Sequence, residues 1–277
     1  MRYHLIAASM LALVVQARPA AGQAMPVTQP SYVHIIREEV KVGRLADHAR
    51  WESGYVAASE RAKDPATYIA LASMTGLNEV WYVTPTASNA VLGERMSFRD
   101  ANPVYSTELD RLDKGDAEFV SSIRALDAVA RPDLSMGAFP DIAKMRFWEI
   151  TLWRVRPGHE EQFGAGVKAF MSAAKRSAPN ASWRTYEVVA GMTGPAYFVF
   201  TSVAAMGDLD KTAADGMATM SGATAEEMAT LQKFSAEAII NSESNRYRLD
   251  PVQSYVPKET RATDPAFWMP KKAAAKP

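Results

Sequence analysis

The chain has 277 residues, with 31 basic and 31 acidic side chains and no cysteine. The missing cysteine excludes disulfides, thiolate catalysis and cysteine-ligated zinc. The balanced charge, without a block of lysine or arginine, argues against nucleic acid as a partner, because phosphate binding requires clustered positive charge.

The first 24 residues have the organisation of a signal peptide. Arg2 and His4 precede an apolar run at residues 5–15, and Gly22 and Ala24 supply small side chains for cleavage. The run is shorter than the roughly 20 apolar residues that a membrane-spanning helix needs. We therefore expect an exported protein, periplasmic or secreted, without a membrane segment after cleavage. An uncleaved anchor is the alternative.

Residues 26–137 predict a first α+β module. Apolar alternation indicates strands and apolar stripes indicate helices. The expected elements are a strand at 33–40, a helix at 45–61, strands at 68–73 and 80–84, a helix at 117–129 and a closing strand after Pro132.

Residues 138–145 read as a linker, and residues 146–256 predict a second module on the same plan. The expected elements are a strand at 146–155, a helix with an apolar stripe at 163–174, strands at 183–190 and 196–202, a helix that begins at Thr224 and a strand at 247–255. Thr224 and Glu227 have the spacing of a capping box, which satisfies amides at a helix start. Residues 257–277 read as a polar tail.

The two modules match at an offset of 115 residues, with small shifts in loops. Tyr55 corresponds to Phe170, and the Met-Thr-Gly at 74–76 recurs at 192–194. The order β-α-β-β-α-β is that of the ferredoxin-like module. We expect an α+β protein in which two tandem modules pack sheet to sheet and enclose a cavity.

These features resemble the dimeric α+β barrel superfamily. The resemblance rests on the strand, the Pro157-Gly158 pair, the helix from Phe163 and the strand pair around Met192-Thr193-Gly194. Within it, the sequence is most similar to NIPSNAP-type and antibiotic-biosynthesis-monooxygenase-type domains. The resemblance implies a barrel with a central cavity. It implies no single reaction, because the superfamily includes cofactor-free monooxygenases, isomerases and haem proteins.

One candidate catalytic pair consists of His34 and Glu149. If Trp148 and Ile150 face the helices, strand alternation turns Glu149 and Trp153 toward the cavity, and the repeat places His34 opposite Glu149. A carboxylate and an imidazole in an apolar pocket can move a proton. The alternative is that both make ordinary strand contacts, because a one-residue slip inverts every face.

A second candidate pair consists of His48 and Glu52, one helical turn apart. Buried, they would be an acid/base couple or the start of a metal site; exposed, they would be an ordinary surface pair. No metal is predicted. Aromatic and polar residues expected around an apolar ligand complete the candidates: Tyr68, Trp81, Trp153, Arg184 and Tyr186.

Three functions remain open on the sequence. The first is binding of a small apolar ligand between the sheets, and the second is cofactor-free monooxygenase or isomerase chemistry. The third is haem binding through His34 or His48; otherwise no cofactor is predicted. A monomeric pseudo-dimer and a homodimer are both compatible with the sequence.

Overall fold

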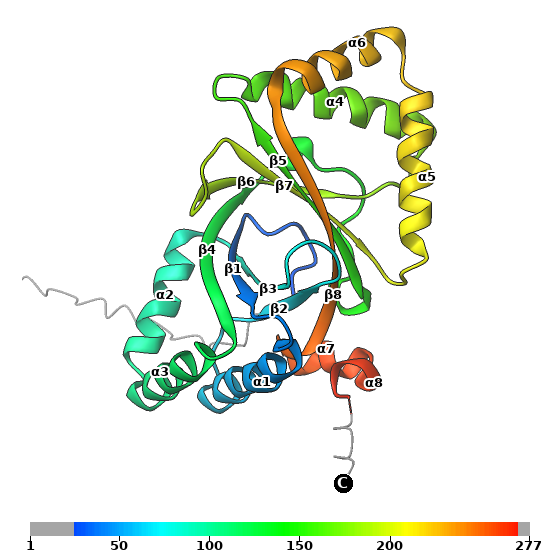
Figure 1. The fold of residues 1–277 in the computed structure, drawn as a ribbon. Coiled ribbons are helices and arrows are strands. Elements are labelled where there is room, and N and C mark those ends of the chain that lie inside the picture. The colour runs from blue at the N-terminus through cyan, green and yellow to red at the C-terminus, as the bar shows by residue number, and fades with distance from the viewer. Residues whose placement is uncertain (1–24, 271–277) are drawn as a thin grey trace, which may run out of the picture.

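Eight strands form one closed antiparallel barrel in the computed structural model, which describes residues 25–270 (Figure 1). The predicted signal peptide and the last seven residues lie outside the described part. In that part, no helix has both the length and the apolar character needed to cross a membrane.

The chain runs through the same kinds of element twice. The first half contains β1 (Tyr32–Val40), α1 (Leu45–Ala62), β2 (Tyr68–Ser73), β3 (Glu79–Thr86), α2 (Asn89–Asp100), α3 (Pro103–Asp116) and β4 (Val120–Ala130). The second half contains β5 (Phe147–Val155), α4 (Glu160–Ser177), β6 (Arg184–Ala190), β7 (Ala196–Val203), α5 (Asp208–Ser221), α6 (Ala225–Lys233) and β8 (Ile239–Tyr255). Two short helices, α7 (Lys258–Thr263) and α8 (Pro265–Trp268), follow.

The strand order around the barrel is β1-β3-β2-β8-β5-β7-β6-β4. Each half therefore contributes four neighbouring strands in the order fourth, first, third, second. The halves join edge to edge, through β2 with β8 and β4 with β6. The prediction of two sheets packed sheet to sheet is corrected here, because these pairings make a single continuous sheet.

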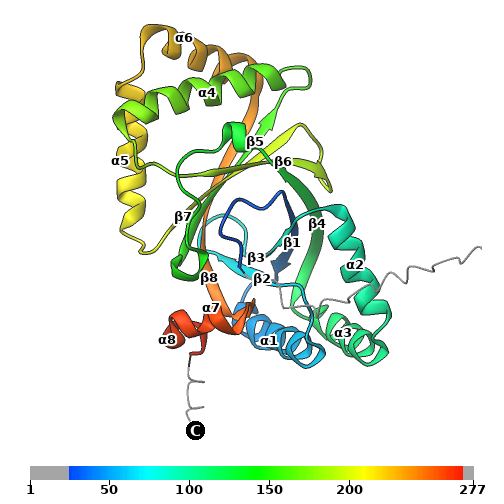
Figure 2. The same cartoon turned by 180° about the vertical axis from the view of Figure 1, so that it is seen from behind.

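The helices lie outside the barrel in two groups. Figures 1 and 2 show α1, α2 and α3 together on one side, and α4, α5 and α6 on the opposite side. Three of these helices, α2, α3 and α5, were not expected from the sequence. Each half thus has two helices, where one was predicted, between its third and fourth strands.

The helix predicted at residues 117–129 is wrong, since this segment is strand β4. Phe119, Ile123 and Leu126 fit a helical spacing, but β4 pairs with β1 along most of its length and with β6 at its C-terminal end. Leu126 joins the barrel core, and Ile123 is 57% exposed. A short apolar run fits both the helical period and the strand period, and here the pairing with neighbouring strands makes the segment a strand.

Large side chains fill the barrel interior. Trp81 packs against Phe198 and Tyr247, with ring centroids 5.2 Å from each. The buried carboxylate of Glu79 accepts hydrogen bonds from Arg37 (2.8 Å) and from the hydroxyl of Tyr247 (2.9 Å). This interior is a packed core with a satisfied ion pair.

The segment predicted as a polar tail contains two short helices, α7 and α8, that pack on the barrel. Trp268 in α8 is 3% exposed and belongs to the barrel core cluster. Its indole N–H donates to the carbonyl of Ala143, in the segment between the halves. Arg146 also donates to Asp264 at 2.7 Å. The C-terminal helices therefore stabilise the connection between the two halves.

Candidate functional site

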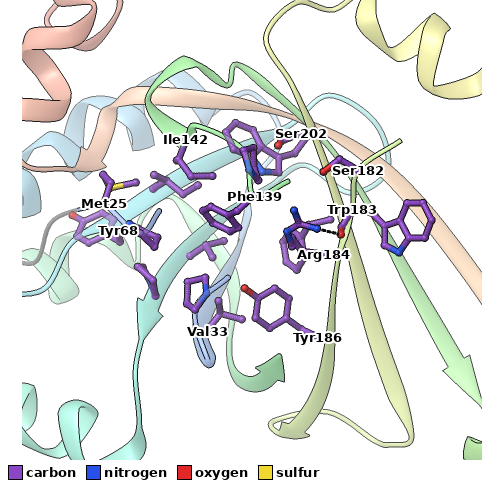
Figure 3. Close-up of a pocket in the computed structure, with 18 residues that line it drawn as sticks. Met25, Val33, Tyr68, Phe139, Ile142, Ser182, Trp183, Arg184, Tyr186 and Ser202 are labelled. Atoms are coloured by element: carbon purple, nitrogen blue, oxygen red, sulfur yellow. Dashed lines mark hydrogen bonds between the residues drawn. The ribbon is translucent and has the colours of Figure 1, made fainter. Parts of the chain in front are cut away.

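The space inside the barrel is small. A cavity of about 80 Å³ lies at one mouth, between the N-terminal segment around Met25 and the loop at Phe139 (Figure 3). Pockets for drug-sized molecules typically measure about 300–1,000 Å³. The cavity predicted between the two sheets is therefore mostly occupied by side chains.

Three predicted ligand-binding residues, Tyr68, Arg184 and Tyr186, line this cavity (Figure 3). The guanidinium of Arg184 donates to the carbonyls of Met136, Gly137 and Trp183. Its burial lowers its pKa, and burial raises the pKa of Tyr186. The N–H groups of Arg184 thus already have backbone partners. The main role of this side chain is to hold the start of β6 against the loop at residues 136–137.

A much larger pocket, of about 720 Å³, lies outside the barrel in the second half of the chain. We call it the helix–sheet groove. Its floor comes from β5 and β7, and its walls come from α4, α5 and the end of α6. In Figure 1, α5 stands away from the barrel beside this groove.

Aromatic side chains form much of the groove wall. Trp153 packs edge to face against Phe234 (centroids 5.5 Å apart), and Phe170 packs against Trp183 (5.8 Å). The indole N–H of Trp183 donates to the carbonyl of Leu134, which fixes the ring. Of the predicted ligand-binding residues, Trp153 is the one that lines the groove.

The charged groups that line the groove lie on α5. Asp208, Lys211 and Asp215 line that wall together with threonine hydroxyls. The sequence analysis missed α5 altogether, since its apolar residues are few and no stripe was visible. The signal available was the pair of acids in its first turn, which suits a helix start.

The chain changes from α6 to β8 through a π-helical turn at Phe234–Ala238. Phe234, the first residue of this turn, projects into the groove. π-Helical turns are rare in proteins, and many of those that occur lie at functional sites. The capping box predicted at Thr224 and Glu227 is confirmed, with both reciprocal hydrogen bonds present at the start of α6.

The cavity positions predicted for His34 and Glu149 are wrong. Val33 and Ile35 point into the barrel core, as do Trp148 and Ile150, so the residues between them face outward. His34 contacts Asp127 at 2.7 Å, and Glu149 accepts from Arg246 at 3.2 Å. Both strand faces carry apolar residues, so alternation alone could not distinguish inside from outside. The two residues lie in separate, partly exposed pairs.

The other predicted aromatic residues also separate. Trp81 is buried in the barrel core, with the guanidinium of Arg37 4.4 Å from the ring. Tyr68 borders the small cavity and packs against Tyr82 and Tyr255. Burial raises the pKa of Tyr68 well above its ordinary value. These residues belong to the framework of the fold.

His48 and Glu52 are both buried, which agrees with the buried-pair alternative of the sequence analysis and not with the surface-pair alternative. His48 is 0% exposed and Glu52 is 5% exposed. Two further acids, Glu38 from β1 and Asp116 from the end of α3, adjoin them. The sequence did not indicate either residue, because no local pattern shows that residues 38 and 116 lie beside α1 in the fold.

Haem bound through His34 or His48 does not fit this arrangement. An axial histidine must face a space that can hold the porphyrin. His34 and His48 line neither the groove, nor the barrel cavity, nor the hollow between α1 and α3. His48 instead contacts a carboxylate oxygen of Glu38 at 3.0 Å.

Comparison with known proteins identifies the fold. No protein-family profile and no curated protein sequence matches this chain. A candidate monooxygenase from Lactobacillus acidophilus NCFM is 8% identical, with 82% of this chain and 98% of that chain covered and a TM-score of 0.50. A candidate monooxygenase from Fusobacterium nucleatum subsp. nucleatum is 8% identical over 79% of this chain and 91% of that chain, with a TM-score of 0.51.

An anthrone oxidase-like protein is 12% identical, with 84% of this chain and 97% of that chain covered and a TM-score of 0.51. At such identities these likenesses concern the backbone arrangement alone. The chain therefore has an α+β barrel fold, shared with solved structures over about four fifths of its length.

Proposed function

We propose that this protein binds a small apolar, largely aromatic molecule in the helix–sheet groove. The observation that carries the proposal is the groove itself, about 720 Å³ in volume and walled by Trp153, Phe170, Trp183 and Phe234. Ligand sites are typically concave, mostly apolar and of this size, with a few polar groups that orient the ligand. Lys211 and Asp215 on α5 supply such groups.

The difference between the two halves supports this location. We infer that the halves are two ferredoxin-like modules in tandem, since they share one strand order. In the first half, Leu109 and Leu112 of α3 pack with Ala58 of α1 in a buried cluster. In the second half, the helices leave the groove open beside the strands. The first half also has a hollow, between α1 and α3, but no residue of the barrel strands lines it. The groove of the second half reaches β5 and β7 and carries the aromatic wall.

The groove can be filled by a substitution that disturbs nothing else. A Cβ at Gly216, on the α5 wall, would meet no atom within 4 Å. Gly216→Phe therefore places a ring in the groove without a backbone clash. Gly93→Phe is the matched control, because Gly93 is also a helical glycine with open space, on α2 and outside the groove.

The test uses anthrone, a tricyclic aromatic ketone suggested by the name of one structural neighbour, as the probe. We expect quenching of tryptophan fluorescence on titration, since Trp153 and Trp183 line the groove. Gly216→Phe should weaken binding at least about tenfold, the equivalent of about 1.4 kcal/mol, and Gly93→Phe should leave it unchanged. Equal affinity in both variants would exclude the groove.

A second candidate is oxidation of the bound molecule without a cofactor. It is supported by Asp208 and Asp215 on the α5 wall, either of which could accept a proton from an acidic ligand. Oxygen consumption with anthrone, and its loss in Asp215→Asn, would establish this chemistry. Binding without oxygen consumption would leave the protein a binder.

We also propose that the mature protein is exported and monomeric. Residues 1–24 carry the signal-peptide pattern. Residues 25–270 of a single chain close an eight-stranded barrel, and this barrel has no free strand edge to pair with a second copy. Fractionation of the native host and light scattering on the purified protein test the two statements. A homodimer in solution would contradict the second.

A further inference from the structure

The buried acidic cluster under α1 is separate from the groove. It consists of Glu38 from β1, His48 and Glu52 from α1, and Asp116 from the last turn of α3. Their exposed fractions are 9%, 0%, 5% and 2%. Each of the four offers one ligand atom, and these four atoms lie within 4.8 Å of one another.

Such a cluster is costly unless something neutralises it. Within residues 25–270, His48 is the one basic side chain that lies within 4.0 Å of any of the three carboxylates. Buried carboxylates repel one another and lose their hydration, so they are stable together when they share protons or bind a cation.

The cluster also contains polar atoms without partners. Oδ1 of Asp116 is buried and makes no hydrogen bond, although it points at His48 Nε2 from 3.6 Å. Nδ1 of His48 is likewise without a partner. Buried polar atoms are nearly always satisfied, and an unsatisfied one often marks a missing water or ion.

The separations suit ligands that converge on one ion. Two ligand atoms about 2.1 Å from a shared metal, at bond angles of about 90–110°, stand about 3.0–3.4 Å apart. His48 Nε2 is 3.0 Å from Glu38 Oε2 and 3.6 Å from Asp116 Oδ1. The other separations within the cluster are at most 4.8 Å, so an ion would draw the ligand atoms together from positions that already surround one point.

We propose that Glu38, His48, Glu52 and Asp116 form a binding site for one divalent transition-metal ion. One imidazole with several carboxylates suits ions such as Zn²⁺ or Mn²⁺, whereas Mg²⁺ and Ca²⁺ prefer oxygen ligands and retained waters. The site lies between the barrel wall and α1–α3. An ion there would tie β1, α1 and α3 together.

The test begins with protein freed of metal by chelation, followed by titration with Zn²⁺ in a calorimeter. We expect one Zn²⁺ per chain and a raised melting temperature. Asp116→Asn and Glu52→Gln should each weaken binding at least about 100-fold. Both substitutions keep the side-chain shape, and each removes a buried charge, so the variants should remain folded by circular dichroism.

Asp127→Asn is the matched control. It removes the carboxylate from the second His–Asp contact of the chain, where His34 and Asp127 are 26% and 34% exposed. We expect unchanged Zn²⁺ binding in this variant. Co²⁺ should give visible absorption bands in the wild type that Asp116→Asn loses. Absence of Zn²⁺ binding by the wild type, equal loss in Asp127→Asn, or an equal melting shift with Mg²⁺ would each overturn the proposal.

Discussion

The ring of Phe234 lies directly over Gly166, so that a Cβ on that glycine would stand 2.4 Å from the ring. This contact joins α4 to the π-helical turn before β8. It also positions Phe234 against Trp153 at the wall of the groove. Gly166 is therefore required because the Phe234 ring leaves no room for a side chain at this position.

Gly166→Ala should destabilise the protein even though alanine favours helices. The new methyl group must displace the Phe234 ring, and overpacking of this kind costs about 1–3 kcal/mol. Gly164→Ala on the same helix meets no atom within 4 Å and should stabilise by up to about 1 kcal/mol. Urea denaturation measures the change in unfolding free energy of each variant, which should be negative for Gly166→Ala and positive for Gly164→Ala. A Gly166→Ala variant as stable as Gly164→Ala would contradict the packing.

Phe234→Ala should open the groove and weaken the fold. Full truncation of a buried phenylalanine costs about 3–5 kcal/mol, and the half-buried Phe234 should cost about 2–3 kcal/mol. Anthrone affinity should fall as well, since the ring is part of the wall. Phe98→Ala is the control, because Phe98 packs against Tyr105 far from the groove. It should lower the unfolding free energy without changing anthrone affinity.

Glu79→Gln should be strongly destabilising, because it leaves the half-buried Arg37 without its charge partner inside the barrel. Breaking a buried pair costs about 3–5 kcal/mol. Glu149→Gln disrupts a partly exposed pair with Arg246, for which about 0–1 kcal/mol is expected. Chemical denaturation measures both values. A large loss in Glu149→Gln would revive a special role for that residue.

The metal-free protein should lose stability as pH rises from about 4 to 6. Burial, followed by the charge of Glu38, raises the pKa of Asp116 to about 6 in the folded state. Ionised Asp116 therefore destabilises the folded state. This destabilisation is absent below the pKa of Asp116 in the unfolded chain and is complete above its pKa in the folded protein. The charged side chains that face Asp116 are Glu38, His48, Glu52 and Asp113.

Thermal melts in the presence of a chelator, at steps of pH between 4 and 8, measure this dependence. Asp116→Asn should flatten the curve, while Asp127→Asn should reproduce the wild-type curve. A wild-type melting temperature that rises through this window would have the opposite sign and would exclude a destabilising carboxylate at residue 116.

Much of the fold was predictable because its signals are local. The strand and helix at 146–177 carry clear periods, and the capping box at Thr224 marks the start of α6. The helices α2, α3 and α5 were missed. The apolar residues of α2 and α5 are sparse and largely exposed. Residues 117–129 were assigned to a helix because a run of apolar residues matched both periods.

The site was less predictable, for a different reason. Strands in a barrel wrapped by helices are apolar on both faces, so alternation could not tell that His34 and Glu149 face outward. The acidic cluster unites residues 38 and 116, which only the pairing of β1 with β4 and the packing of α3 on α1 bring together. His48 and Glu52 were visible from their spacing, but their burial depends on those distant neighbours.

A crystal structure with a bromine-substituted anthrone would show where the ligand binds. Anomalous scattering from the bromine locates the molecule without assumptions about its pose. We expect a peak in the groove between Trp153 and the α5 residues around Gly216. A peak at the barrel mouth beside Tyr186, or none at saturating ligand, would contradict the account.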